Sequence, residues 1–191
     1  PVPLATKVRP AGDYPALVSE DYLQRVQELS LSEVRALSEQ GRQDARIQLA
    51  RLLWLSGDAN APIPLLEEPA KAGVPVAQYL LGTYLRYRNR DPERGLKLIA
   101  EAANQGHPIA QESLAWFYET GRHGLPLDIE KAFDLYLQAA QQGLAHSQMN
   151  VGMMLCAGRG VAQDKALGAA WFVSSQQGQR APLSAKQGGC E

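Results

Sequence analysis

The residues that could carry out chemistry are few, and their spacing is not that of a catalytic or metal-binding site. The three histidines are His107, His123 and His146, and no two of them have the close spacing of a metal-ligand pair. The sequence has no nucleophile-elbow serine, no phosphate-loop lysine and no HExxH motif. We therefore expect no catalytic residue, no metal and no cofactor, and we do not expect an enzyme.

The remaining polar motifs have structural explanations. Glu67-Glu68, and Asp128 with Glu130, suit helix caps or an exposed surface. Gly158-Arg159-Gly160 follows no predicted strand, so it does not fit a dinucleotide-binding loop.

The one local charge bias combines arginine with tyrosine, two residue types common at protein-binding hot spots. Its members are Arg42, Arg46, Arg51, Arg86, Arg88, Arg90 and Arg94, beside Tyr79, Tyr84 and Tyr87. A solvated helix face and a patch for an acidic protein surface are both consistent with it.

The whole chain has no basic excess, since 19 basic and 20 acidic residues leave a net charge of −1. Nucleic-acid binding is therefore not expected. No apolar run is long enough to span a membrane. With 191 residues and 45% hydrophobic content, the chain can bury a core.

The elements that position these residues follow a repeat. Five glycines, at positions 41, 73, 106, 143 and 178, are 32, 33, 37 and 35 residues apart. A period of this size is typical of a solenoid.

Each repeat begins with a helix whose inner face alternates small and large residues. Offsets of 4, 8, 9 and 12 from each glycine lie on one helix face. Glycine inside a helix costs about 1 kcal/mol against alanine, so Gly82 and Gly152 predict a close approach to a neighbouring backbone. The inner positions are Ala45, Leu49, Ala50 and Leu53; Ala77, Leu81, Gly82 and Leu85; Ala110, Leu114, Ala115 and Tyr118; and Ser147, Val151, Gly152 and Leu155.

A second helix completes the repeat. Asp128 is the predicted N-cap of one such helix, and Asp91-Pro92 starts another. The glycine after each second helix predicts a left-handed stop. Each repeat is therefore predicted to consist of a helix, a loop, a second helix and a glycine turn.

This pattern resembles the Sel-one-like repeat (SLR) family, relatives of tetratricopeptide (TPR) repeats. The resemblance rests on Leu81-Gly82, Tyr118-x-x-Gly121, Leu155-x-x-Gly158-x-Gly160-Val161, Asp128-x-x-Lys131-Ala132 and Ala139-Ala140-x-x-Gly143. It implies an all-α protein, a right-handed superhelical α-solenoid of helix-turn-helix repeats. We expect four repeats, at 41–72, 73–105, 106–142 and 143–178. Pro62, Pro64 and Pro69 predict a short or kinked second helix in the first repeat.

The flanks differ in character from the repeats. Residues 1–18 hold four prolines and predict an extended arm, either a tether or a segment packed on the solenoid through Leu4, Tyr14 and Leu17. Residues 19–40 predict two capping helices, the second opened by the capping box Ser30-x-x-Glu33. Residues 179–191 are a tail or cap.

Two cysteines, Cys156 and Cys190, leave a disulfide and free thiols both open. A removed signal peptide would explain the start at Pro1, and so would trimming of the chain.

The family resemblance implies that the first helices line a concave, partner-binding face. Aromatics, methionine and arginine are enriched in recognition surfaces, although Trp116 and Met153 could instead be extra core. The predicted binding residues are Arg51, Tyr79, Arg86, Glu112, Trp116, Met149 and Met153.

The resemblance also implies a protein-protein interaction module, either a bacterial envelope adaptor or an immunity protein that neutralises a secreted toxin or lipase effector. One alternative is a scaffold for an envelope machine such as a polysaccharide exporter or flagellar motor. Another is a TPR-type groove in which Arg46, Arg51 and Arg86 clamp a carboxylate. A small-ligand or β-lactamase-like protein is more remote, because relatives of that kind pair cysteines within repeats. We expect a monomer that is periplasmic or exported, with a cytoplasmic location as the alternative.

Overall fold

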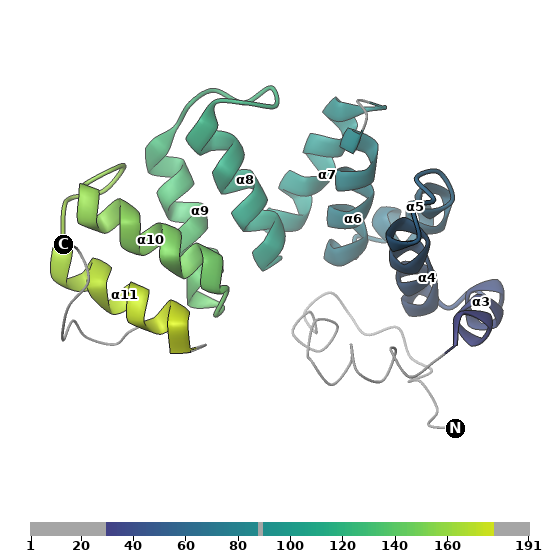
Figure 1. The fold of residues 1–191 in the computed structure, drawn as a ribbon. Coiled ribbons are helices and arrows are strands. Elements are labelled where there is room, and N and C mark those ends of the chain that lie inside the picture. Colours follow the sequence, from purple (N-terminus) through teal and green to yellow (C-terminus); the bar gives the residue numbers. More distant parts are fainter. Residues whose placement is uncertain (1–29, 88–89, 178–191) are drawn as a thin grey trace. The chain divides into compact units, whose positions relative to one another are not determined.

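The computed structural model describes residues 30–87 and 90–177, and in these ranges every regular element is a helix (Figure 1). The prediction of an all-α repeat fold is confirmed. The chain divides into two compact units, between Leu98 and Ile99. The first holds α3 (Leu31–Glu39), α4 (Gln43–Leu55), α5 (Pro62–Lys71), α6 (Pro75–Arg86) and the start of α7 (Pro92–Asn104). The second holds the rest of α7, α8 (Pro108–Thr120), α9 (Ile129–Gln141), α10 (Ala145–Ala157) and α11 (Lys165–Gln177).

Some predictions lie outside the described residues, namely the arm at 1–18, the first capping helix, the glycine at 178 and the tail at 179–191. The right-handed sense of the superhelix stays a prediction, because each unit is placed by itself.

Helices begin where the sequence predicts caps. The Ser30 N–H donates to Glu33 Oε2 (2.7 Å) and the Ser30 hydroxyl accepts from the Glu33 N–H, which completes the capping box of α3. Asp128 Oδ1 accepts from the N–H of Lys131 (2.9 Å) at the start of α9. Helix α7 begins at Pro92, as expected.

Helix pairs end in one recurring turn. The glycines at 41, 73, 106 and 143 have φ angles of 84°, 78°, 87° and 93°, in the left-handed region. The residue after each glycine donates its N–H to a carbonyl five positions back, as His107 does to Ala102 (3.0 Å). This is a Schellman motif, and it reverses the chain after each second helix.

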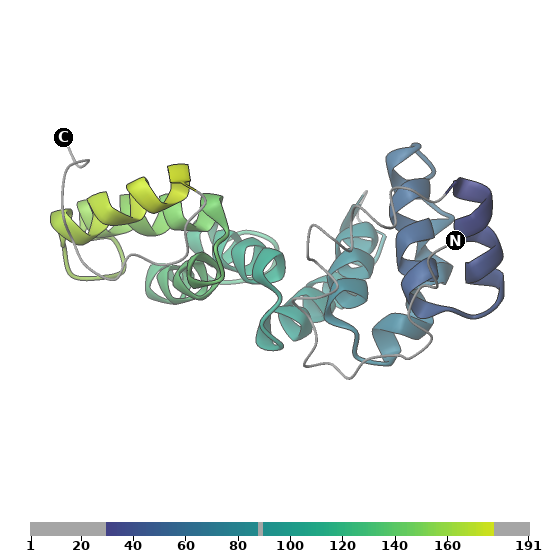
Figure 2. The same ribbon diagram turned by 90° about the horizontal axis from the view of Figure 1, so that it is seen from below.

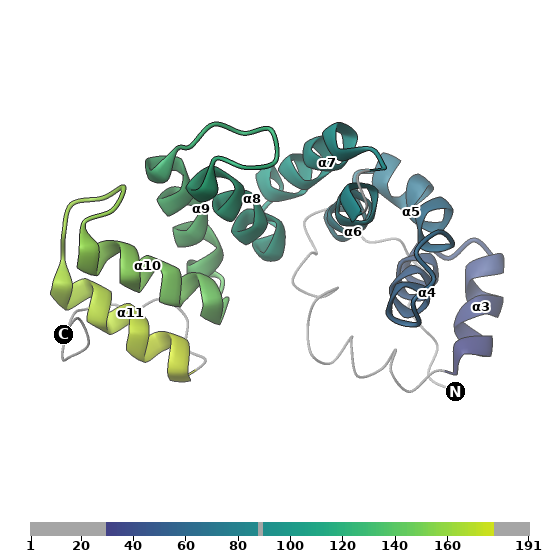
Figure 3. The ribbon, with the colours of Figure 1, turned by 45° about the horizontal axis from the view of Figure 1, so that its top comes forward.

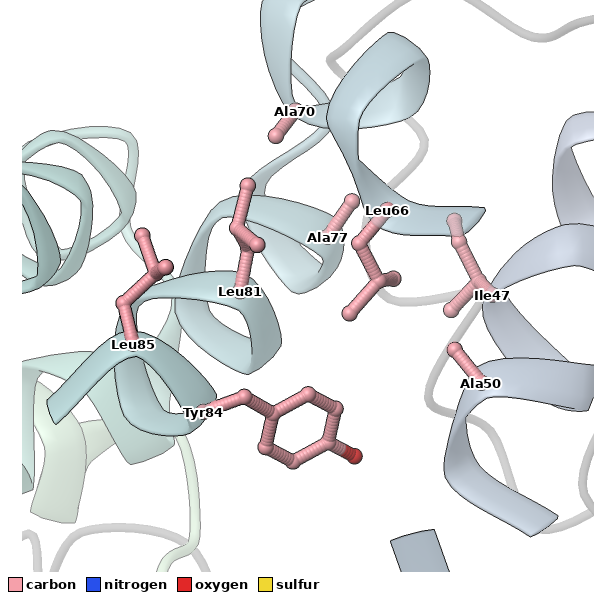
Figure 4. Packing of buried hydrophobic residues seen from close by; sticks show 8 residues of the cluster. All are labelled: Ile47, Ala50, Leu66, Ala70, Ala77, Leu81, Tyr84 and Leu85. Atoms are coloured by element: carbon pink, nitrogen blue, oxygen red, sulfur yellow. The ribbon is translucent and has the colours of Figure 1, made fainter. Parts of the chain in front are cut away.

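The predicted inner faces are buried. In the first unit, α4, α5 and α6 share a core that includes Leu66 and Leu81, both 0% exposed (Figure 4). Of the sixteen inner positions, only Leu53 and Tyr118 are half-exposed. Helix α5 is short, with 10 residues, and Pro62 stands in its first turn. The proline-rich second helix is therefore short, as predicted.

The helical glycines mark close crossings. A Cβ at Gly95 on α7 would lie 2.6 Å from the Gly82 carbonyl oxygen on α6. A Cβ at Gly168 on α11 would lie 2.8 Å from the Gly152 oxygen on α10. Real Cβ atoms essentially never approach so closely, so the predicted backbone contact is confirmed at both glycines.

In the second unit, α8 packs on α9, α9 on α10 and α10 on α11; the α10–α11 pair is clear in Figures 2 and 3. Two buried glutamines anchor the first helices in the same way. Gln111 Nε2 on α8 donates to the Ala103 carbonyl (3.3 Å), and Gln148 Nε2 on α10 donates to the Ala140 carbonyl (3.2 Å). Because α8 and α10 are held alike, their equivalent residues face the same way relative to the turn before each helix.

Candidate protein-binding surface

The second unit exposes large apolar side chains on its two first helices. Trp116 on α8 is 40% exposed, and Met149 and Met153 on α10 are 40% and 47% exposed. Trp116 and Met153 are both ten residues past the closing glycine of the preceding repeat, so they are equivalent. This exposure places them on the surface rather than in extra core. With Ile109 and Glu112 they form a surface that we call the α8/α10 face.

Glu112 connects the two helices of this face. The Ser147 hydroxyl on α10 donates to Glu112 Oε2 (3.0 Å), and His146 Nδ1 lies 3.9 Å from Oε1. The Glu112 side chain is 25% exposed, whereas that of His146 is 80% exposed. Glu112 thus ties α8 to α10 and still shows part of its carboxylate to solvent.

The Trp116 ring is supported from its own repeat. Its centroid lies 5.6 Å from that of Phe117 and 5.3 Å from that of His123. His123 has a φ of 63°, in the left-handed region, in the loop after α8. These ring contacts restrict the indole and leave one part of it open, which is a favourable starting point for binding.

Glu119, one turn further along α8, is engaged within the fold. It accepts from the Tyr136 hydroxyl on α9 (3.0 Å), and Arg159 Nη2 lies 3.3 Å from its other oxygen. Burial, and then the Glu119 charge, raise the pKa of Tyr136. This network joins two successive repeats and has a structural role.

The first unit holds an aromatic stack. The Trp54 ring on α4 stacks on Tyr84 of α6 at 4.1 Å, and Tyr87 meets its edge at 4.8 Å. Burial raises the pKa of Tyr84 to about 12, although the nearby Arg51 charge opposes this increase. Arg51 therefore lies within electrostatic reach of the stack.

The other two predicted residues of the first unit are half-buried. Arg86 covers the crossing of α6 and α7, because its Cγ would lie 2.6 Å from a Cβ added at Gly95. Burial lowers the pKa of the Arg86 guanidinium. Tyr79, on the same helix, is partly covered too. Arg86 thus contributes to helix packing as well as to the surface.

Several arginines of the predicted patch are used within the fold. Arg42 pairs with Asp44 (2.6 Å), and Arg94 on α7 pairs with Glu67 on α5. Arg90 donates to a carbonyl in the loop after α4. These contacts favour a structural role for this part of the patch.

The structure therefore places Glu112, Trp116, Met149 and Met153 together in the second unit. The other three predicted residues lie in the first unit, and a single stripe across both units stays a prediction. Sequence reasoning missed Ile109, which is 39% exposed, and left Trp54 out of the binding set. Ile109 lies three residues before Glu112 and seven before Trp116, on the same helix face, and this spacing could have identified it.

His107 has a structural role. His107 is 1% exposed and caps α8, its Nδ1 accepting from the Ala110 N–H (3.1 Å). Burial lowers its pKa to about 4.

Within residues 30–87 and 90–177, no group of three or more metal-ligating side chains could hold an ion. The possible disulfide between Cys156 and Cys190 lies outside the described residues, because it involves Cys190.

None of the helices in the described ranges combines the length and the apolar character needed to cross a membrane.

Comparisons with known proteins agree with the repeat fold. A family model described as the Sel1 repeat matches residues 75–107, 108–144 and 145–175. A solved Sel1 repeat protein from Oxalobacter formigenes is 30% identical with a TM-score of 0.56, over 59% of this chain and 86% of that one. A protective antigen with an SLR fold from uropathogenic Escherichia coli is 24% identical with a TM-score of 0.68, over 78% of this chain and 33% of that one.

Two curated relatives are longer proteins. An uncharacterised Neisseria meningitidis protein is 33% identical over 151 residues, and the match covers 78% of this chain and 32% of that protein. Chitin synthase regulatory factor 3 of Schizosaccharomyces pombe is 32% identical over 130 residues, which are 65% of this chain and 14% of that protein. The chain thus spans a third or less of these relatives.

Proposed function

Because the chain belongs to the Sel1 repeat family, whose members generally mediate protein-protein interactions, we propose that it is a protein-binding module of the bacterial cell envelope. In this proposal it acts as a monomer, in the periplasm or after export. It works as an adaptor or as an immunity protein that binds and neutralises a secreted toxin or lipase effector.

The observation that carries the proposal is the exposure of Trp116, Met149 and Met153 on neighbouring first helices. Tryptophan and methionine are among the residue types enriched at protein interfaces. Leaving such side chains in water forgoes the free energy of their burial, about 2 kcal/mol for a fully buried one, so a partner that covers them gains it.

A binding role, rather than catalysis, fits the chemistry of the described residues. The buried histidine is a helix cap, and Glu119 is engaged by Tyr136 and Arg159. The fission yeast relative is named as a regulatory factor of an enzyme. We propose by analogy that this chain too acts on an enzyme by binding it.

Affinity capture from the native lysate tests this proposal, with wild type and Trp116→Ala as bait. Leu127→Ala is the matched control, because Leu127 is 64% exposed but lies in the loop before α9. We expect one dominant partner that Trp116→Ala loses and Leu127→Ala retains. A partner unaffected by Trp116→Ala would contradict binding through this face.

The activity of the captured partner separates the two roles. An immunity protein forms a stoichiometric, very tight complex that abolishes an enzyme activity. A scaffold for an envelope machine, such as a polysaccharide exporter or a flagellar motor, binds several partners with moderate affinity and leaves their activity intact. Cell fractionation and light scattering test the location and the monomeric state.

A further inference from the structure

We propose that the α8/α10 face recognises a cationic side chain, arginine or lysine, in a partner segment that also presents apolar residues. This inference rests on the protein-binding function proposed above and specifies the chemistry of the partner. It follows from the state of Glu112, from the groups around it and from the charge of the second unit.

Glu112 has no permanent counter-ion among the residues that the structure describes. Oε2 accepts the Ser147 hydroxyl, and His146 Nδ1, which is charged only when protonated, lies 3.9 Å from Oε1. Glu119, on the same helix, already has Arg159 at 3.3 Å. Glu112 is therefore the carboxylate of this face that an external cation can neutralise.

The position of Glu112 strengthens its interaction with such a cation. Its side chain is three-quarters covered, and a partly desolvated carboxylate interacts more strongly with a cation than one in bulk water does. The hydroxyl of Ser147 holds the carboxylate in place, so little side-chain entropy remains to be lost on binding.

The neighbours of Glu112 suit the rest of an arginine or lysine side chain. Trp116 lies one turn further along α8, and its exposed ring can accept a cation over its face. Met149 and Met153 provide an adaptable apolar surface for the methylene stem and for flanking apolar residues of the partner.

The net negative charge of the second unit also favours a cationic partner. The sequence of the second unit, residues 99–191, contains eight carboxylates and six arginines or lysines, a net charge of −2. Such a field attracts a basic partner and disfavours an acidic one. The carboxylates are Glu101, Glu112, Glu119, Asp128, Glu130, Asp134, Asp164 and Glu191, and the cations are Arg122, Lys131, Arg159, Lys165, Arg180 and Lys186.

Fluorescence polarisation with two labelled peptides tests the proposal on the full chain. The peptides share their leucine and phenylalanine positions, and one carries arginine wherever the other carries glutamate. The variant Glu112→Gln removes the charge and retains an oxygen that can accept from Ser147. The control Asp134→Asn removes the same charge from an exposed position on α9.

We expect the arginine peptide alone to bind. Glu112→Gln should weaken it about fivefold and Trp116→Ala about tenfold, while Asp134→Asn changes it less than twofold. Equal binding of both peptides, binding of neither, or equal effects of Glu112→Gln and Asp134→Asn would overturn the proposal. If a captured natural partner is lost in Trp116→Ala but binds Glu112→Gln normally, protein binding stands and cation recognition alone fails.

Discussion

Acid should destabilise this protein through one buried side chain, His107. The ring is 1% exposed and accepts the Ala110 N–H through Nδ1, which requires that nitrogen to be unprotonated. Burial lowers the pKa of His107 from 6.5 to about 4. Protonation in the folded state would both desolvate a charge and remove the cap of α8.

The direction and the size of this change in stability follow from the linkage between protonation and folding. Above pH 6.5 His107 is neutral in both states and does not make stability depend on pH. Between that pH and about 4, the unfolded chain binds a proton that the folded chain does not, so the free energy of unfolding falls as the pH falls. The full loss is about 3 kcal/mol, and about 2 kcal/mol of it is reached by about pH 5.

Urea denaturation of wild type and His107→Asn, at a series of pH values, measures this loss. Asparagine is a good N-cap and does not titrate, so the variant should lose less stability than wild type by about 2 kcal/mol between about pH 7.5 and about pH 5. The difference between the two slopes is the readout, because other groups titrate in both proteins.

A matched variant makes the test specific. His146→Asn removes a histidine whose side chain is 80% exposed, and this variant should still lose about 2 kcal/mol between about pH 7.5 and about pH 5, because His107 is retained. Equal slopes for wild type and His107→Asn, or an NMR titration of His107 near its ordinary pKa, would refute the reasoning.

Three further changes test the fold. Gly168→Ala should lower the free energy of unfolding by about 2 kcal/mol in urea titrations, because the added Cβ would lie 2.8 Å from the Gly152 oxygen; an unchanged midpoint would contradict the close crossing. Asp128→Ala should cost about 1 kcal/mol by removing the cap of α9, with loss of helical circular dichroism at a lower temperature as the measure. Leu81→Ala should cost about 3 kcal/mol in the first unit, whereas Leu55→Ala, at a 78% exposed position, should cost under about 0.5 kcal/mol; equal costs would mean that the core is wrongly placed.

The caps, turns and inner faces could be predicted because they depend on residues close together in the chain. Ser30 and Glu33 cap one another within a single turn, and Asp128 reaches an N–H three residues away. The left-handed turn at Gly106 needs only a residue without a Cβ. Gly82 also identified a close contact in advance, because its cost in a helix needs a compensating reason.

The candidate site could be predicted only in part. The sequence placed Trp116 and Met153 on equivalent faces of two different first helices, but whether neighbouring helices cover those faces depends on how the helices pack. Arg86 was predicted as a binding residue, and the structure shows that it also fills the space beside Gly95. Ile109 was missed, since an apolar residue at a helix start is usually core.

The sequence by itself determined that this protein is an array of helix pairs, because periodic apolar residues, caps and glycine turns are local and repeat along the chain. Only the tertiary structure decided which polar and aromatic groups are used internally and which remain for a partner. The Glu112–Ser147 bond joins residues 35 apart, and the Tyr136–Glu119 bond joins successive helices. Such pairings depend on how helices pack, and packing sets the exposure of each side chain through all its neighbours at once.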